Sequence, residues 1–153
     1  MSKISLHQNV LAQLRERFRL LLSAAAETRR GATDPENRSE GKYDTRSIEA
    51  NYLADGQGRQ AEKLAHAVAA IEQLGPRPWG ADEPISSGAV VEVAMRGARL
   101  WFYVVPAGGG QEITFEGREV TLLTPESPLG RQLVGARRGH RTKEPDATVL
   151  QVL

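Results

Sequence analysis

The chain has 153 residues and a formal net charge of +1, so no overall field favours nucleic acid, and any basic surface must be a local patch. It contains no Cys, which excludes disulfides, thiolate catalysis and Cys-ligated metal ions. No apolar run approaches the roughly 20 residues of a membrane span, and the first residues lack the apolar core of a signal peptide. We therefore expect a cytoplasmic, monomeric protein without membrane contact.

The first expected element is a long helix over residues 5–29. Its apolar residues recur at alternating short spacings, which is the pattern of a helix packed lengthwise on another helix. This stripe consists of Leu11, Leu14, Phe18, Leu21 and Ala25.

A second long helix is expected over residues 43–74, because the same spacing returns there. Residues 30–41 between the helices are rich in turn-forming types, so we expect an antiparallel hairpin with an acidic tip at about residues 31–44. The second stripe has small side chains near the tip and larger ones near the base, which predicts a more weakly packed tip. It consists of Ala50, Ala54, Gln57, Ala61, Leu64, Val68 and Ile71.

Beyond the second helix the hydrophobic period changes to that of β-strands. Residues 75–88 are proline-rich and predict an extended connector, and Arg96-Gly97 and Glu116-Gly117 indicate hairpin turns. The sequence thus predicts an α+β fold, with a coiled-coil hairpin, a linker, and a small, mainly antiparallel sheet domain with one short helix. The expected boundaries are 1–75, 76–88 and 89–153, and the expected strands are 91–95, 100–105, 112–115, 120–123 and 148–153.

The short helix expected in the sheet domain has clearly marked ends. Ser127 is an N-cap, Pro128 takes the first helical position, and Gly135 falls at a left-handed C-cap. The run Ser-Pro-Leu-Gly-Arg-x-Leu-x-Gly-x-x-x-Gly over residues 127–139 resembles the C-terminal domain of the bacterial Gre transcript-cleavage factors. The resemblance implies an FKBP-like domain that binds RNA polymerase at the rim of its secondary channel. The implied binding residues are Ser127, Pro128, Leu129 and Arg131.

The resemblance extends to the hairpin through Glu36-Asn37, which is similar to the acidic Glu-Asn of the family's tip loop. It implies that Asp34 and Glu36 reach the polymerase active site, help to hold magnesium shared with the polymerase, and promote cleavage of backtracked RNA. Hard carboxylate oxygens suit a two-metal phosphoryl-transfer site of this kind. The protein itself would then be no enzyme and would have no cofactor of its own.

The tip departs from the family pattern Asp-x-x-Glu-Asn, because Thr33 stands where the first acid is expected and Asp34 is displaced by one residue. A ligand misplaced by about 1 Å can cost 10²-fold in rate. The alternative in the same class is therefore a non-cleaving Gre homologue that occupies the channel and inhibits or tunes transcription. An FKBP-like isomerase or chaperone is the alternative from another class, with Trp101 and Tyr103 as pocket wall rather than core.

The basic residues of the first helix have two interpretations. They contact phosphates of nascent RNA, or they form a solvated face paired with Glu16 and Glu27. The candidates are Arg15, Arg19, Arg29 and Arg30, with Arg17 beside them. The three His residues are dispersed and predict no zinc site. Gly108-Gly-Gly110 lacks the Lys-Ser/Thr of a phosphate loop and predicts a hairpin connection.

Overall fold

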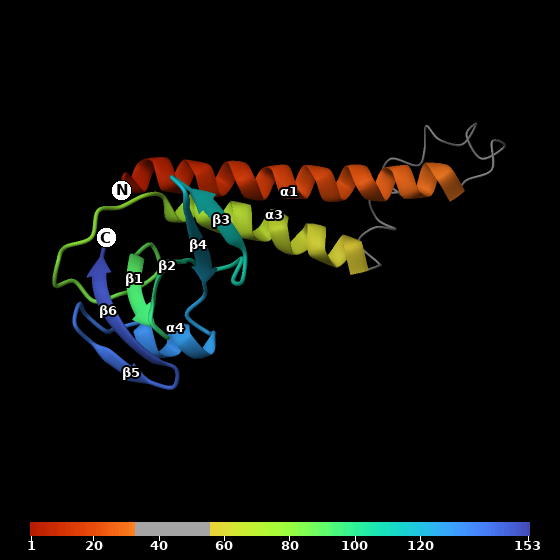
Figure 1. Cartoon of the computed structure of the whole chain (residues 1–153). Coiled ribbons are helices and arrows are strands. Elements are labelled where there is room, and N and C mark those ends of the chain that lie inside the picture. Colours follow the sequence, from red (N-terminus) through yellow and green to blue (C-terminus); the bar gives the residue numbers. More distant parts are fainter. Residues whose placement is uncertain (33–55) are drawn as a thin grey trace.

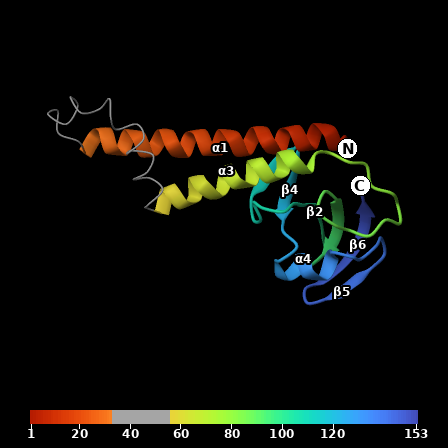
Figure 2. The same cartoon turned by 180° about the vertical axis from the view of Figure 1, so that it is seen from behind.

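The computed structural model describes residues 1–32 and 56–153. Two helices, α1 (Lys3–Ala32) and α3 (Gly56–Leu74), lie side by side and extend well beyond the sheet (Figure 1). The end of α1 and the start of α3 both lie at the far end of this pair, as the reverse view also shows (Figure 2). At 1.5 Å per residue, α1 is about 45 Å long. The antiparallel helix pair is confirmed, and residues 43–55 of the second predicted helix lie outside the described residues.

The rest of the described chain forms a six-stranded sheet with the order β3-β4-β2-β1-β6-β5 and one short helix, α4 (Pro128–Leu133). Neighbouring strands are antiparallel except β2 and β4, which run parallel. The α+β class is therefore confirmed. The strands are β1 (Val90–Met95), β2 (Ala98–Val104), β3 (Glu112–Phe115), β4 (Arg118–Leu123), β5 (Arg141–Lys143) and β6 (Asp146–Val152).

Both predicted hairpin turns are present. Arg96 and Gly97 have φ values of 53° and 76°, and Glu116 and Gly117 have 51° and 73°. Two successive residues with positive φ form a turn whose twist matches that of the flanking antiparallel strands. These turns join β1 to β2 and β3 to β4.

Two strand predictions were incomplete at the C-terminal end. The sequence did not predict β5, and β6 begins at Asp146 rather than at residue 148. In β5 only Thr142 is buried, between exposed Arg141 and Lys143, so the strand lacks the apolar alternation on which a prediction depends. Its pairing with β6, which includes the Lys143–Asp146 register pair, holds it in the sheet.

One hydrophobic core fills the space between the sheet and the base of the helix pair. Leu6 and Leu14 of α1 are fully buried there together with Tyr103 and Ile113 of the sheet. Burial of one such side chain stabilises the fold by about 1.5–3 kcal/mol. The remaining buried members are Val10, Leu11, Ala67, Ile71, Val90, Val105, Phe115, Val120 and Leu122.

A second core covers the opposite face of the sheet, where α4 lies. Fully buried Leu133 of α4 packs there with Val91 and Val93 of β1. The predicted alternation along β2 is confirmed, because Phe102 and Val104 belong to this core whereas Tyr103 belongs to the first. The other buried members are Ile85, Ala89, Leu123, Ala147, Val149 and Val152.

Helix α1 also lies along the outer edge of β3. The side-chain amide of Gln13 donates to the Thr114 carbonyl oxygen at 2.7 Å and accepts from the Thr114 N–H at 3.3 Å. One helical turn further on, Arg17 donates to the carbonyl oxygen of Glu112. Side chains of α1 thus occupy backbone groups of β3 that a further strand would otherwise use.

The connector after α3 packs on the sheet domain. Ile85 is buried in the second core, and its backbone exchanges hydrogen bonds with Gly135 and Ala136, both at 2.8 Å. The guanidinium of Arg77 lies 3.7 Å from the Trp79 ring centroid. The ammonium of Lys3 lies 4.5 Å from the same centroid, so the connector also contacts the first turn of α1.

Neither described helix of this hairpin, nor α4, is long and apolar enough to cross a bilayer.

Candidate functional site

The segment that resembles the Gre signature forms α4, and its N-terminal end is the predicted one. The Ser127 hydroxyl accepts from the Gly130 N–H at 3.0 Å and donates to the Thr124 carbonyl oxygen at 2.8 Å. Pro128 is the first helical residue. At the other end the C-cap is Val134 in an extended conformation rather than Gly135, which follows it with the predicted positive φ, 86°. N-cap hydrogen bonds of this kind are typically worth about 1 kcal/mol, so the segment is locally well defined.

Close packing against the backbone explains why residue 130 of this segment is a glycine. A Cβ on Gly130 would lie 2.0 Å from the Thr124 carbonyl oxygen and 2.8 Å from the Ser127 hydroxyl oxygen. No side chain can occupy that space without moving the backbone. Gly130 therefore permits the tight approach of Thr124 that positions the cap.

The four residues predicted to bind polymerase do not all face solvent. Ser127 is half-buried, and Leu129 packs partly buried against the second core. Pro128 and Arg131 are exposed, as is the neighbouring Val134. The surface that α4 offers to a partner therefore consists of Pro128, Arg131 and Val134, while Ser127 and Leu129 hold the helix in place.

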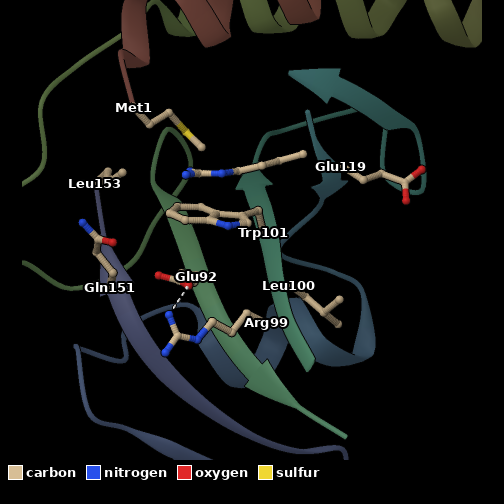
Figure 3. A pocket seen from close by; sticks show the side chains of 9 residues that line it. Met1, Glu92, Arg99, Leu100, Trp101, Glu119, Gln151 and Leu153 are labelled. Atoms are coloured by element: carbon tan, nitrogen blue, oxygen red, sulfur yellow. Dashed lines mark ion pairs between the residues drawn. The ribbon is translucent and has the colours of Figure 1, made fainter. Parts of the chain in front are cut away.

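A second surface lies on the sheet face beside the base of the hairpin (Figure 3). It is an open cavity of about 650 Å³ centred on Trp101. The Arg118 guanidinium lies 5.2 Å from the Trp101 ring centroid, a cation–π distance. An ion pair joins Arg99 to Glu92 at 3.8 Å, while Glu119 points away from the indole.

The structure shows whether Trp101 and Tyr103 belong to the core or to the wall of a pocket. Trp101 is half-buried, packs against the first core and lines the cavity, so it belongs to both. Tyr103 is fully buried and belongs to the core. Arg99 lies two residues from Trp101 on β2, so the alternation of a strand places both on one face. The nearness of Arg118 was not predicted, because Arg118 reaches Trp101 only through the pairing of β2 with β4.

Beneath the helices lies a buried polar pair that the sequence did not predict. Nδ1 of His7 lies 2.8 Å from the hydroxyl oxygen of Tyr103. Burial lowers the pKa of His7 and raises the pKa of Tyr103 to about 12. Near neutral pH the pair is therefore an uncharged imidazole hydrogen-bonded to a protonated phenol.

The arginines predicted to contact RNA have carboxylate partners where their side chains are described. Arg15 pairs with Glu72 of α3, and Arg19 pairs with Glu16 at 2.7 Å. Both arginines are more than half exposed, at 55% and 63% of the side chain. Exposed pairs of this type are weak, so either arginine can exchange its carboxylate for a phosphate at small cost. Arg29 and Arg30 belong to the last turns of α1.

The predicted tip acids, Asp34 and Glu36, lie outside the described residues. In residues 1–32 and 56–153 no group of three or more His, Asp or Glu side chains is placed to hold a metal ion. The described chain also keeps α4 on the sheet face opposite the hairpin (Figure 1). Helix α4 and the described parts of α1 and α3 therefore lie on different sides of the sheet.

No protein-family model matches the chain. No curated protein matches it either. Among solved structures, it is similar to GreA factor homolog 1 (Gfh1) of Thermus thermophilus, with 20% identity, 98% of this chain and 94% of that chain covered, and a TM-score of 0.36. Gfh1 of Thermus aquaticus gives 20% identity, 98% and 93% coverage, and a TM-score of 0.35. Because these identities and TM-scores are low, we derive the proposed function from this chain's own residues.

Proposed function

We propose that this protein regulates transcription elongation by binding RNA polymerase through the sheet domain and placing the hairpin in the secondary channel. The observation that carries the proposal is the signature segment at residues 127–139, which resembles the Gre factors and forms a capped helix with exposed Pro128 and Arg131. A helix pair that extends away from the sheet, with α1 alone about 45 Å long, suits insertion into a channel (Figure 1).

In this proposal the residues between α1 and α3 carry the activity. Asp34 and Glu36 would supply carboxylate oxygens, which are the ligands that magnesium prefers. A magnesium ion shared with the polymerase would stabilise the charge that develops during phosphodiester cleavage. Arg29 and Arg30, at the end of α1 nearest these acids in sequence, would contact RNA phosphates.

A specific observation favours a second activity, namely channel occupation without cleavage. Thr33 stands where the resemblance requires the first acid, so one of the two expected carboxylates is displaced by a residue. A factor with incomplete ligands would bind the polymerase and slow or tune synthesis instead of stimulating cleavage.

Binding is tested by a pull-down of bacterial core RNA polymerase with Arg131→Glu. Arg131 is exposed, so the variant is expected to fold, and reversal of its charge should weaken binding roughly tenfold or more if a carboxylate faces it. Arg138→Glu is the matched control, because Arg138 is an exposed arginine beyond α4. Equal loss from both variants, or loss from neither, would contradict the proposed surface.

The two activities are separated with labelled RNA in a backtracked elongation complex. The native protein, Asp34→Ala and Glu36→Ala are compared at saturating concentration, with Glu62→Ala on the exposed side of α3 as control. Stimulated cleavage that both tip variants lose supports the cleavage factor. Binding with slower RNA extension and no added cleavage supports the non-cleaving regulator. Cleavage that survives both tip substitutions shows that Asp34 and Glu36 do not carry the activity.

A further inference from the structure

A groove lies between the two helices and the loop that joins β2 to β3. Its volume is about 510 Å³, and small-molecule sites typically enclose about 300–1,000 Å³. Its lining includes Arg17 of α1 and Lys63, His66 and Gln60 of α3. Three nitrogen-bearing side chains thus converge from two helices on one concave surface.

The positive charge of this groove is not neutralised by neighbouring acids. Arg17 donates to the side-chain oxygen of Gln111 at 2.8 Å and to the carbonyl oxygen of Glu112. Both acceptors are uncharged, so they fix the guanidinium in place and leave its charge intact. Over residues 1–32 and 56–153, neither Arg17 nor Lys63 forms an ion pair.

Apolar side chains line the groove as well. Leu21, Leu64 and Ala107 line it. Gly108 brings the loop close to α3, because a Cβ at this position would lie 3.0 Å from the Cβ of Ala67. The loop joins β2 to β3, which are not neighbours in the sheet, so the predicted hairpin connection is wrong. The loop instead forms a wall of the groove.

We propose that this groove binds a nucleoside triphosphate, with its phosphates at Arg17, Lys63 and His66 and its base against Leu21 and Leu64. Guanidinium and ammonium groups are the usual partners of phosphate oxygens in proteins. The apolar wall provides the surface that a planar base needs, which a free inorganic anion would not use. This site is distinct from α4 and from the tip acids, so it does not depend on polymerase binding.

The test is titration of the full-length protein with ATP by isothermal calorimetry. Lys63→Gln combined with His66→Gln should weaken ATP binding about tenfold or more, because it removes two of the phosphate partners. The control combines Lys143→Gln with His140→Gln, which makes the same two changes at exposed positions on β5 and just before it. This control should bind ATP like the native protein. Arg17 is left unchanged because it also contacts β3.

Two further probes separate the nucleotide from other phosphate sources. Tripolyphosphate, which has no base, should bind clearly more weakly than ATP, and a short single-stranded RNA should be displaced by ATP. Absence of ATP binding at millimolar concentration would overturn the proposal, as would equal loss in the control. Equal affinity for tripolyphosphate, or RNA binding that ATP does not displace, would also overturn the assignment of a nucleotide.

Discussion

At α4, the residues of the Ser-Pro-Leu-Gly run hold the helix as well as offering a surface. Ser127 and Gly130 form the cap, and Leu129 packs against the second core. A substitution at any of these three is therefore expected to lower the proposed polymerase binding through loss of local structure. Changes at exposed Pro128, Arg131 and Val134 report on contact itself. The N-cap was predictable because capping depends on residues close in sequence.

Because the imidazole of His7 is buried, we expect the protein to be less stable in mild acid than near neutral pH. Burial lowers the pKa of His7 in the folded protein, so the unfolded chain binds more protons than the folded one as pH falls below 6.5, the ordinary value of the group. His7 therefore opposes folding in acid and not above its unfolded pKa. We expect the Tm to fall between pH 7.5 and pH 5, and to fall less in His7→Gln.

The control for this experiment is His140→Gln, which changes an exposed imidazole and should keep the native pH dependence. Both variants are melted in the same buffers with circular dichroism as the readout. An unchanged slope of Tm against pH in His7→Gln would show that other groups cause the acid sensitivity.

At the scale of the helices, packing is concentrated at the base of the hairpin. Within the predicted stripe of α1, Leu11 and Leu14 are buried, whereas Phe18 and Leu21, further towards the tip, are half-buried. The predicted thinning of the seam towards the tip agrees with this gradient on α1. The apolar stripe included Leu14 but missed Leu6 and Val10, which are also fully buried and belong to the core that α1 shares with the sheet.

A pair of leucine variants measures this gradient. Leu14→Ala should lower the free energy of unfolding by about 2–5 kcal/mol, as is typical when a fully buried leucine leaves a cavity. Leu21→Ala removes the same atoms from a half-buried position of the same stripe and should lower it by only about 1 kcal/mol. Urea denaturation of both variants gives the comparison. Equal losses would show that the hairpin packs uniformly along its length.

At the scale of the whole molecule, the sequence predicted elements better than their mutual contacts. The hydrophobic period located the helices, β1 and β2, and the pairs Arg96-Gly97 and Glu116-Gly117 located both tight turns. All of these signals come from residues close in sequence. The pairing of His7 with Tyr103, 96 residues apart, leaves no local trace, because each residue alone is compatible with many environments. The Trp101 cavity and the groove between the helices and the β2–β3 loop also leave no local trace in the sequence, because their residues come together from different elements only after folding.

The division into a hairpin (1–75), a linker (76–88) and a sheet domain (89–153) stays a prediction, and the shared core gives it a sharp test. A fragment of residues 76–153 would expose Tyr103, Ile113 and other side chains that pack on the helices in the full chain. We expect it to bind a hydrophobic dye and to melt without cooperativity, whereas the full chain melts cooperatively. A cooperative transition close to that of the full chain would establish the sheet domain as independent.

The contact of Gln13 and Arg17 with β3 has a consequence for how this protein behaves at high concentration. A sheet has two outer strands, and an uncovered one can recruit a strand from another molecule and start fibrous aggregation. Here α1 occupies the free backbone groups of Thr114 and Glu112 at one edge. At the other edge, β5 is only three residues long and carries two exposed cations, which discourages such pairing. Helix α1, which is one arm of the hairpin, thus also protects the sheet from pairing with strands of other molecules.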